Sequence, residues 1–356
     1  MPQADAAAAP LHAFEPLTPD LVLDALASVG LYGDGRLMAL SSYENRVYQV
    51  HLETPRPTAG LLAPFVSDEP AIVVAKFYRP ERWSDAQIGE EHAFSAELMA
   101  DEIPVIGPLA LQGQTLHHFG GFAFSVSPRR GGRAPELDDL DVLEWIGRFL
   151  ARIHNVGAKQ PFSHRPALNV QTFGADSRDY LLNHDLLPLD VQTAWAEKSL
   201  NAIELITSIG RSVGEVATIR LHGDCHPGNI LWTPADAPTR QGPGPHFVDM
   251  DDARMGPAVQ DLWMLQSGDR PQRTRQLGAL VDGYEQFREF DRRELALIEP
   301  LRTLRLIHYS AWLARRWADP TFPINFPWFG SSDYWKGQVL MLEEQIEAMQ
   351  EAPLAV

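Results

Sequence analysis

Two short stretches carry the residues whose types and spacing could do chemistry. The first runs from His222 to Asn229 (HGDCHPGN) and places Asp224 five positions before the amide Asn229. An apolar run, a turn-rich connection and a second apolar run follow, and the second run ends at Asp249. Because two apolar runs joined by a turn favour a hairpin, we expect Asn229 and Asp249 to lie together.

These residue types suit phosphoryl transfer. That reaction needs in-line positioning and compensation of negative charge more than covalent catalysis. A carboxylate must accept or orient the acceptor hydroxyl, and we predict this role for Asp224. Magnesium takes oxygen ligands, with phosphates and water completing the set. We predict that Asn229 and Asp249 hold Mg²⁺, and we count Asp249 with Asp224 as catalytic.

The remaining polar residues of these stretches are interpreted as supports. We expect His222 to hold the loop by hydrogen bonds and Asp261 to be a buried cap or anchor. Cys225 is expected to be a small packed side chain, because no activating partner for a thiolate is visible. His226 is expected to be scaffolding.

A metallohydrolase is the alternative chemistry, since histidines and carboxylates also make hydrolytic metal sites. Its ligands would come from His222, Asp224, His226, Asp249, Asp251 and Asp252. That hypothesis leaves the Asn229 amide and the upstream features described next unexplained. Asp251 and Asp252 stay ambiguous between a second metal and a cap of the following turn.

Upstream, one lysine stands near the end of the apolar strand-like run 71–78. Burying an ammonium costs several kcal/mol unless it is paired, so we predict that Lys76 binds phosphate. The alternative is an edge strand from which Lys76 points to solvent. A capping box at Ser84 opens a helix that carries Glu90, Glu91 and Glu97, and one of these acids could orient the lysine.

The elements that must position these residues form two lobes. Residues 1–16 are predicted to be a disordered tail, 17–127 a β-rich N-lobe, 128–133 a hinge and 134–356 a helical C-lobe. Strands are expected within 37–52, 71–78, 114–119 and 121–126. Thr18-Pro19-Asp20 is expected to start a helix, with a hydroxyl cap and Pro at the first helical position. Helices are also expected at 140–156, 190–213, 259–266, 272–290, 293–317 and 334–350, from their apolar spacing. The aromatic stretch 322–335 is expected to be irregular. The fold class is α+β, with the site in the cleft between the lobes.

Composition restricts the partners. The net charge of −17 disfavours nucleic acid and anionic membrane surfaces. The single cysteine excludes an internal disulfide and fits a reducing compartment. No basic leader or bilayer-long apolar run is visible, so we expect a cytoplasmic protein that does not meet a membrane. We expect a monomer.

The motif His222-Gly223-Asp224 with Asn229, followed by Asp249, Gly256-Pro257 and Asp261-Leu262, resembles the phosphotransferase branch that includes aminoglycoside and choline kinases. That branch shares the protein-kinase-like fold. Further stretches, 42–48, 76–83, 249–265 and 311–328, resemble bacterial kinase-like proteins described as Ser/Thr protein kinases of stressed cells.

The resemblance implies roles for several residues. Asp224 would be the proton acceptor, and Asn229 and Asp249 would bind magnesium. It selects Glu91, seven residues before Leu98, as the partner of Lys76. Ser42 would lie at the ATP site. Ser41 beside it and Ser127 at the hinge complete the predicted nucleotide-binding set. The turn at 41–45 has no glycine to cradle phosphates, so the serine hydroxyls could take that part.

The sequence therefore predicts an ATP- and magnesium-dependent phosphotransferase, with a Ser/Thr protein as acceptor on the strength of the resemblance. A small-molecule kinase is the alternative, since the segment between Asp252 and Asp261 is too short for a peptide-docking activation loop. A nucleotide-binding pseudokinase is a third hypothesis, which the complete set of catalytic side chains disfavours.

Overall fold

The computed structural model of the 356-residue chain describes residues 12–53, 72–236 and 242–356. These residues divide into two compact units, each assembled from separated stretches of chain. Unit 1 comprises the described residues up to Gly89, Pro108–Arg129 and Arg315–Pro327. Unit 2 comprises Glu90–Gly107, Arg130–Ala314 and Trp328–Val356. The predicted tail, 1–16, lies mostly outside the described residues.

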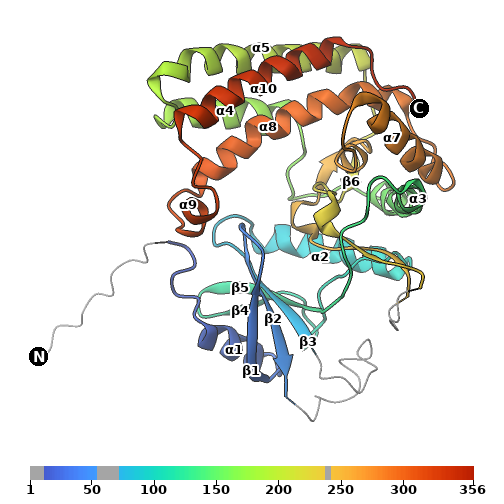
Figure 1. The fold of residues 1–356 in the computed structure, drawn as a ribbon. Helices are drawn as coiled ribbons and strands as arrows, with labels where there is room; N and C mark the ends of the chain where they lie inside the picture. The colour runs from blue at the N-terminus through green and yellow to red at the C-terminus, as the bar shows by residue number, and fades with distance from the viewer. Residues whose placement is uncertain (1–11, 54–71, 237–241) are drawn as a thin grey trace, which may run out of the picture. The chain divides into compact units, whose positions relative to one another are not determined.

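Unit 1 is built on a five-stranded antiparallel sheet with strand order β1-β2-β3-β5-β4 (Figure 1). Its strands are β1 (Gly33–Leu40), β2 (Arg46–Leu52), β3 (Ile72–Phe77), β4 (His117–Phe119) and β5 (Phe122–Pro128). Helix α1 (Pro19–Ser28) buries Val22 and Leu26 in one core with Val50, Phe77 and Phe124 of the sheet. The strands predicted in this half of the chain are confirmed.

Two capped helices begin in unit 1 where the sequence predicts them. The Thr18 side chain accepts a hydrogen bond from Leu21 N at 3.2 Å and so caps α1. Ser84 and Gln87 form the predicted capping box of α2 (Asp85–Ala100), since each side chain bonds the other residue's backbone N–H, at 3.3 and 2.9 Å.

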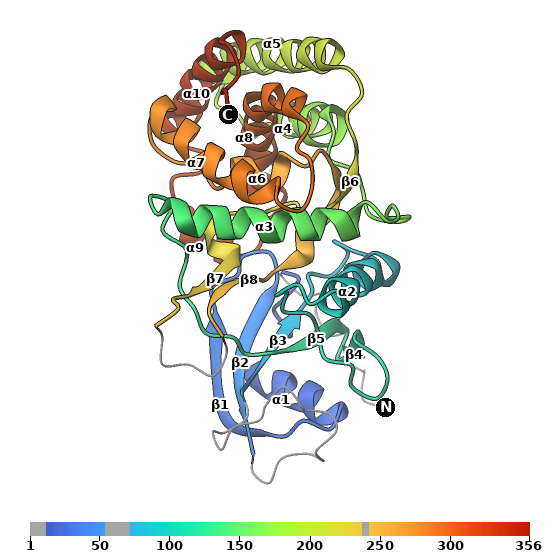
Figure 2. The ribbon, with the colours of Figure 1, turned by 90° about the vertical axis from the view of Figure 1, so that its right-hand side faces the viewer.

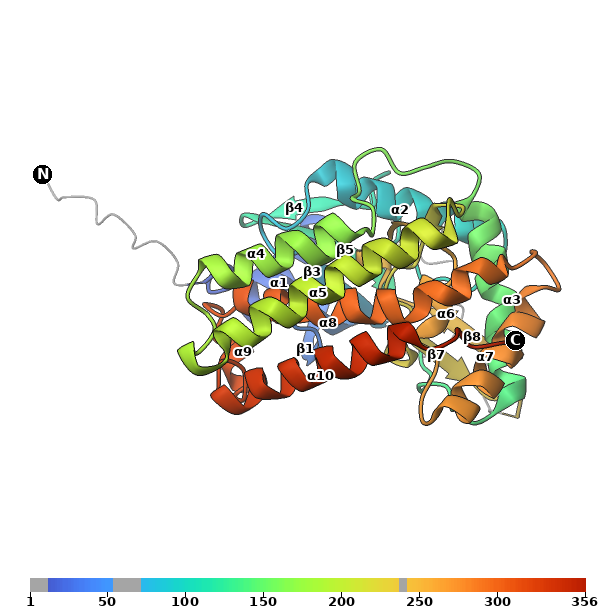
Figure 3. The ribbon, with the colours of Figure 1, turned by 90° about the horizontal axis from the view of Figure 1, so that it is seen from above.

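Unit 2 is mainly helical (Figure 2). Its longer helices are α3 (Leu140–Gly157), α4 (Asp176–Asn183), α5 (Leu189–Val213), α7 (Arg270–Tyr284), α8 (Ile298–Arg315, whose last residue belongs to unit 1) and α10 (Ser332–Gln350). Helices α5 and α10 lie side by side (Figure 3). No helix that the structure describes is both long and apolar enough to cross a membrane.

Short elements complete the chain. They are the π-helical turn η1 (Val170–Ala175), the 3-10 turns η2 (Pro227–Asn229), η3 (Met250–Asp252) and η4 (Arg292–Leu297), and the helices α6 (Gln260–Trp263) and α9 (Thr321–Asn325). Two antiparallel strand pairs lie in unit 2: β6 (Ile219–Leu221) with β9 (Arg254–Gly256), and β7 (Ile230–Thr233) with β8 (Gly244–Phe247). The loop from His222 to Asn229 lies between β6 and β7.

Two expectations need correction. The helix predicted over 293–317 divides into η4 and α8. Pro300 is the reason, because its ring is tolerated only in the first turn of a helix and α8 begins two residues before it. The stretch 322–335, expected to be irregular, contains part of α9 and the start of α10.

The contact between α3 and α7 depends on glycine (Figure 2). A Cβ atom built on Gly147 of α3 would lie 2.1 Å from the carbonyl oxygen of Leu280, and one on Gly283 of α7 would lie 1.9 Å from that of Glu144. The two backbones therefore approach closely only because both positions lack a side chain.

Gly147→Ala is expected to lower the free energy of unfolding by about 1–3 kcal/mol, since the helices must move apart. Gly210→Ala in α5 is the matched control, because nothing lies within 4 Å of its Cβ position. There alanine should stabilise the helix by roughly 0.5–1 kcal/mol. Urea denaturation of both variants makes the measurement. Equal stability of Gly147→Ala and the parent would contradict the close approach.

Candidate active site

The loop from His222 to Asn229 runs between β6 and β7. In the β7–β8 hairpin, Ile230 pairs with Phe247, and Val248 N donates to the Asn229 carbonyl at 3.0 Å. That bond carries the pairing one step past the strands, to Asn229 and Val248, and Asp249 follows one residue beyond this pair. The hairpin predicted from the two apolar runs is therefore confirmed. Residues 237–241 of its connection lie outside the described residues.

Asp249 adopts a left-handed backbone conformation with φ of 59°. Few non-glycine residues do so, and those that do cluster at sites where surrounding structure imposes the geometry. The following residues form η3, and β9 then returns to pair with β6. The loop and Asp249 are thus held by two short antiparallel pairs.

Asp261 anchors the start of the loop. Its side chain is fully buried; Oδ1 accepts from Gly223 N and Oδ2 from His222 N, both at 2.8 Å. Oδ2 also accepts from His154 Nε2 at 3.0 Å. The anchor role predicted for Asp261 is confirmed.

Burial works to raise the pKa of Asp261. The hydrogen bond and charge of His154, the charge of His222 and the Gly223 N–H outweigh burial and leave the pKa below its ordinary value. The carboxylate is therefore the form that the loop requires.

Two further contacts fix the shape of the loop. Gly223 has φ of +86°, and a Cβ there would lie 2.1 Å from the carbonyl oxygen of Asp252. His222 donates from Nε2 to the Val248 carbonyl at 2.9 Å, which ties the loop to the strand that returns toward Asp249. His222 is therefore a structural residue, as predicted.

Asp224 lies in this loop and is partly exposed, with 22% of its side chain accessible to solvent. Arg305 of α8 donates from Nη1 to its Oδ1 at 2.5 Å. The Asn229 side chain donates from Nδ2 to the Asp224 carbonyl at 3.0 Å. That bond uses the amide nitrogen of Asn229 and leaves its amide oxygen as the atom suited to a metal.

The two reactive-looking neighbours of Asp224 are packed as supports. Cys225 is fully buried, and burial raises the pKa of its thiol well above the ordinary value, with the nearby carboxylates of Asp261 and Asp224 adding to the effect. His226 accepts from Gly228 N through Nδ1 at 3.0 Å. Burial lowers the pKa of His226, and the charge of Arg305 lowers it further against the opposing Asp224. The His226 ring is thus kept neutral.

Comparison with known proteins identifies the family. The family model described as "Phosphotransferase enzyme family" matches residues 37–298, which is most of the chain. The chain belongs to this phosphotransferase family. The resemblance of the loop to aminoglycoside and choline kinases is thereby confirmed.

Relatives within the phosphotransferase family cover almost the whole chain. The stress response kinase A of Shigella flexneri and that of Escherichia coli (strain K12) are each 45% identical over 341 residues, 96% of either chain. The "Serine/threonine protein kinase RdoA" of Salmonella typhimurium is 43% identical over the same share. The resemblance of the longer stretches to stress-response kinases is confirmed as well.

Solved structures agree on the fold. An amicoumacin kinase in complex with AMP-PNP, Ca²⁺ and "Ami" matches with a TM-score of 0.67, at 17% identity over 94% of each chain. A microcompartment-associated aminopropanol kinase matches with a TM-score of 0.66, at 17% identity over 93% of this chain and 98% of its own. The predicted α+β, protein-kinase-like fold is confirmed.

The residues predicted to bind nucleotide are mostly in unit 1 of this phosphotransferase. Lys76 lies in β3, opposite Val47 of β2 and Ser125 of β5. Because β3 is a central strand, the alternative of an edge-strand lysine is wrong. Ser41 and Ser42 open the turn between β1 and β2, and Ser127 lies in β5 opposite Val74. Their nucleotide-binding roles stay predictions.

Glu91 is nearly buried in α2, in unit 2, and makes an ion pair that the sequence did not suggest. Its Oε2 accepts from Arg165 Nη2 at 3.2 Å. Arg165 also donates to the carbonyls of Asp251 and Ala253, at 2.7 and 2.9 Å. The ion pair links the predicted lysine-pairing acid to the turn that follows Asp249. The pairing of Glu91 with Lys76 stays a prediction.

The metallohydrolase alternative finds no geometric support. Across residues 12–53, 72–236 and 242–356, no group of three or more His, Cys, Asp or Glu side chains is arranged to hold a metal ion. Asp252 instead pairs with Arg254 at 2.5 Å. The predicted cation donors are one amide oxygen, from Asn229, and one carboxylate, from Asp249, and their role stays a prediction. That set suits magnesium with phosphate ligands better than a hydrolytic zinc.

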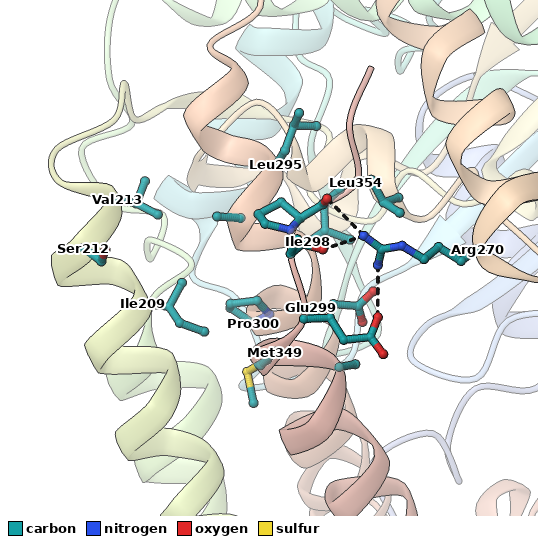
Figure 4. Close-up of a pocket in the computed structure, with 15 residues that line it drawn as sticks. Ile209, Ser212, Val213, Arg270, Leu295, Ile298, Glu299, Pro300, Met349 and Leu354 are labelled. Carbon is teal, nitrogen blue, oxygen red and sulfur yellow. Dashed lines mark hydrogen bonds and ion pairs between the residues drawn. The ribbon is translucent and has the colours of Figure 1, made fainter.

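A cavity of about 210 Å³ lies elsewhere in unit 2, between the end of α5, the start of α8 and the C-terminal residues (Figure 4). Arg270 reaches across it to Glu351 at 3.2 Å and to the Pro353 carbonyl at 3.0 Å. None of its lining residues belongs to the loop or the hairpin, so it plays no part in the site.

Sequence reasoning missed three residues that shape the site. They are Arg305 on Asp224, Arg165 on Glu91, and His154 on Asp261. Each pair is separated by 74 residues or more, and no local pattern marks the distant partner. Only for His154 was there a signal, because a polar residue stood within the apolar face of the helix predicted at 140–156.

Asp261→Asn is expected to destabilise the chain by about 2–3 kcal/mol, because an amide nitrogen would face a backbone donor. Phosphotransfer should fall with it. A carboxyl with a lowered pKa stabilises above its unfolded pKa of about 3.9 and loses the effect as pH falls through the folded value. The deficit of the variant, measured by urea denaturation, should thus be constant from about pH 5 to 8 and shrink in more acidic solution. A deficit that grows on acidification would refute this.

Glu294 is a buried carboxyl whose pKa is shifted in the opposite direction from that of Asp261. Its Oε2 accepts from Val259 N, at the start of α6, at 2.8 Å. Burial nevertheless raises its pKa to about 7. The folded chain then holds a proton that the unfolded chain releases near pH 4.3, so stability should fall as pH rises from about 4.3 to 7. Glu294→Gln keeps the acceptor and should lose that slope. Denaturation at pH 5 and 8 measures it, and an unchanged slope would contradict the assignment.

Proposed function

We propose that the chain is an ATP- and magnesium-dependent kinase that phosphorylates Ser or Thr of a protein. The observation that carries the proposal is the arrangement around Asp224: the Asn229 side chain bonds its carbonyl, Asp249 follows the residue that bonds Asn229, and the loop is anchored on Asp261. The name of the Salmonella relative supports the choice of acceptor. The bound AMP-PNP and Ca²⁺ of the amicoumacin kinase support nucleotide and divalent metal.

In the proposed mechanism, the acceptor hydroxyl would approach the partly exposed Asp224 carboxylate. Asp224 would take the hydroxyl proton as the oxygen attacks the γ-phosphorus of ATP and the bond to the β-phosphate oxygen breaks. ADP would leave with the electrons of that bond. Asn229 and Asp249 would hold magnesium, which compensates phosphate charge when bound. Lys76 and the serines of the 41–45 turn would hold the phosphates.

Arg305 bonds one of the two Asp224 carboxylate oxygens, Oδ1. Because 42% of its side chain is exposed, we expect Arg305 to turn away from Asp224 when an acceptor binds. In this proposal the arginine keeps the carboxylate in place between turnovers and yields to the acceptor.

A small-molecule acceptor is the second candidate. One observation favours it: β9 begins at Arg254, two residues after Asp252, so no long segment is available there to dock a peptide. The amicoumacin and aminopropanol kinases, which share the fold, act on small molecules by their names. The two candidates share every step at Asp224 and differ only in what carries the hydroxyl.

Asp224→Asn should reduce phosphotransfer by roughly 10²–10⁴-fold, since the general base is lost. Its matched control is Asp179→Asn, because Asp179 has an exposed side chain in α4 of the same unit. The chain would be incubated with magnesium and labelled ATP, alone, with dephosphorylated casein, and with a panel of aminoglycosides, choline and aminopropanol.

Label on casein or on the chain itself that disappears in Asp224→Asn and persists in Asp179→Asn supports the protein-kinase proposal. Label confined to a small molecule replaces it with the second candidate. ATP binding with no transfer in any mixture refutes both.

A further inference from the structure

The 41–45 turn of unit 1 is held by arginine side chains. The carbonyl of Tyr43 accepts from Arg46 Nη1 at 3.2 Å and from Arg79 Nη2 at 3.3 Å. Arg79 Nε donates to the Glu44 carbonyl at 2.9 Å. A turn without glycine has thus acquired fixed partners for two consecutive carbonyls, which limits the motion of its backbone.

Asp319 holds the two arginines in place. Its Oδ2 accepts from Arg46 Nη2 and from Arg79 Nη2, each at 2.8 Å. Its Oδ1 accepts from Thr321 N at 3.0 Å, and only 3% of the side chain is exposed. Charge-assisted hydrogen bonds in such a buried setting are stronger than exposed ion pairs.

The chemistry of Asp319 fits a fixed negative charge. Burial works to raise the pKa of this carboxyl, but hydrogen bonds from Arg79 and Thr321 N and the charges of Arg46 and Arg79 outweigh it. The pKa therefore lies below its ordinary value, and the carboxylate is ionised at neutral pH.

Two further residues close to Asp319 in the sequence, Arg316 and Phe326, also contact the 41–45 turn. Arg316 donates from Nε and Nη2 to the two carboxylate oxygens of Glu44, at 2.7 and 3.1 Å. Phe326 packs edge-on against the Tyr43 ring, with ring centroids 4.9 Å apart. We call residues Arg315–Pro327 the clamp segment. It belongs to unit 1 although more than 180 residues separate it from the rest of that unit.

In the ion pairs described here, arginines outnumber carboxylates beside the turn. Two carboxylates, from Glu44 and Asp319, meet four guanidinium groups, from Arg46, Arg79, Arg82 and Arg316. In a chain with a net charge of −17, this is a local field that favours an anion. A turn that receives phosphate groups would benefit from both the field and the rigidity.

We propose that Asp319 and Arg316 are positioning residues for nucleotide binding, because they hold the 41–45 turn in the geometry in which Ser41 and Ser42 meet the phosphates. The inference rests on the proposed function, since it assumes that this turn binds ATP. Neither residue touches the nucleotide in this proposal; each acts through Glu44, Arg46 or Arg79.

The test compares nucleotide affinity with stability. Asp319→Asn removes the charge that holds both arginines, and Glu44→Gln weakens the arm from Arg316. Arg316→Lys keeps the charge but cannot form the paired contact. Asp34→Asn is the matched control, because Asp34 makes an exposed ion pair with Arg36 in the same unit. Each protein is titrated with Mg·ATP by calorimetry, and its kcat, its KM for ATP and its melting temperature are measured.

Asp319→Asn and Glu44→Gln should each raise the Kd and KM for ATP by about tenfold or more, because small displacements of a binding element are costly. The kcat should change much less, and Asp34→Asn should match the parent. Arg316→Lys should lie between the parent and Glu44→Gln.

If the folded variants bind ATP as tightly as the parent and differ only in melting temperature, the clamp is merely structural and the inference is wrong. If Asp319→Asn does not fold, Glu44→Gln and Arg316→Lys decide by the same criterion. A parent that does not bind ATP at all would refute the proposed function itself, which separates that failure from a failure of the clamp.

Discussion

The candidate site depends on one buried carboxylate. Asp261 accepts hydrogen bonds from the backbone of His222 and Gly223 and from the ring of His154. His154 in turn bonds Tyr284 of α7 through Nδ1 at 2.9 Å. A charge without access to water is stable only when its hydrogen bonds are complete, so the loop, α3, α6 and α7 must be assembled together. The position of Asp224 is therefore a property of the unit 2 core.

A second theme is the use of arginine in an acidic chain. Arg165, Arg305 and Arg316 each meet a carboxylate at or near a predicted site residue. The planar guanidinium can bond two acceptors at once, as Arg165 does with two carbonyls and Arg316 with two carboxylate oxygens.

Local chemistry in the sequence was enough to predict much of this structure. The cap at Thr18, the capping box at Ser84, the β7–β8 hairpin and the anchor role of Asp261 all follow from short-range patterns or burial arguments. The sequence could not reveal Arg305, Arg165 or Asp319, because pairing between distant residues leaves no periodic trace. Helix α4 and the π-helical turn before it were also missed, since the stretch 158–188 shows no clear apolar repeat. The apolar spacing over 293–317 predicted one helix, but Pro300 requires a helix start just before it, so α8 begins at Ile298.

The clamp segment has a consequence for synthesis on the ribosome. The five strands of unit 1 have all been synthesised once residue 129 is made, but Arg316 and Asp319 follow about 190 residues later. At translation rates of about 5–20 residues per second, that delay is roughly 10–40 s. During it the 41–45 turn has Arg46 and Arg79 but lacks the contacts from Arg316, Asp319 and Phe326. A chain that ended before residue 316 would carry the complete sheet without the contacts from the clamp segment that hold this turn.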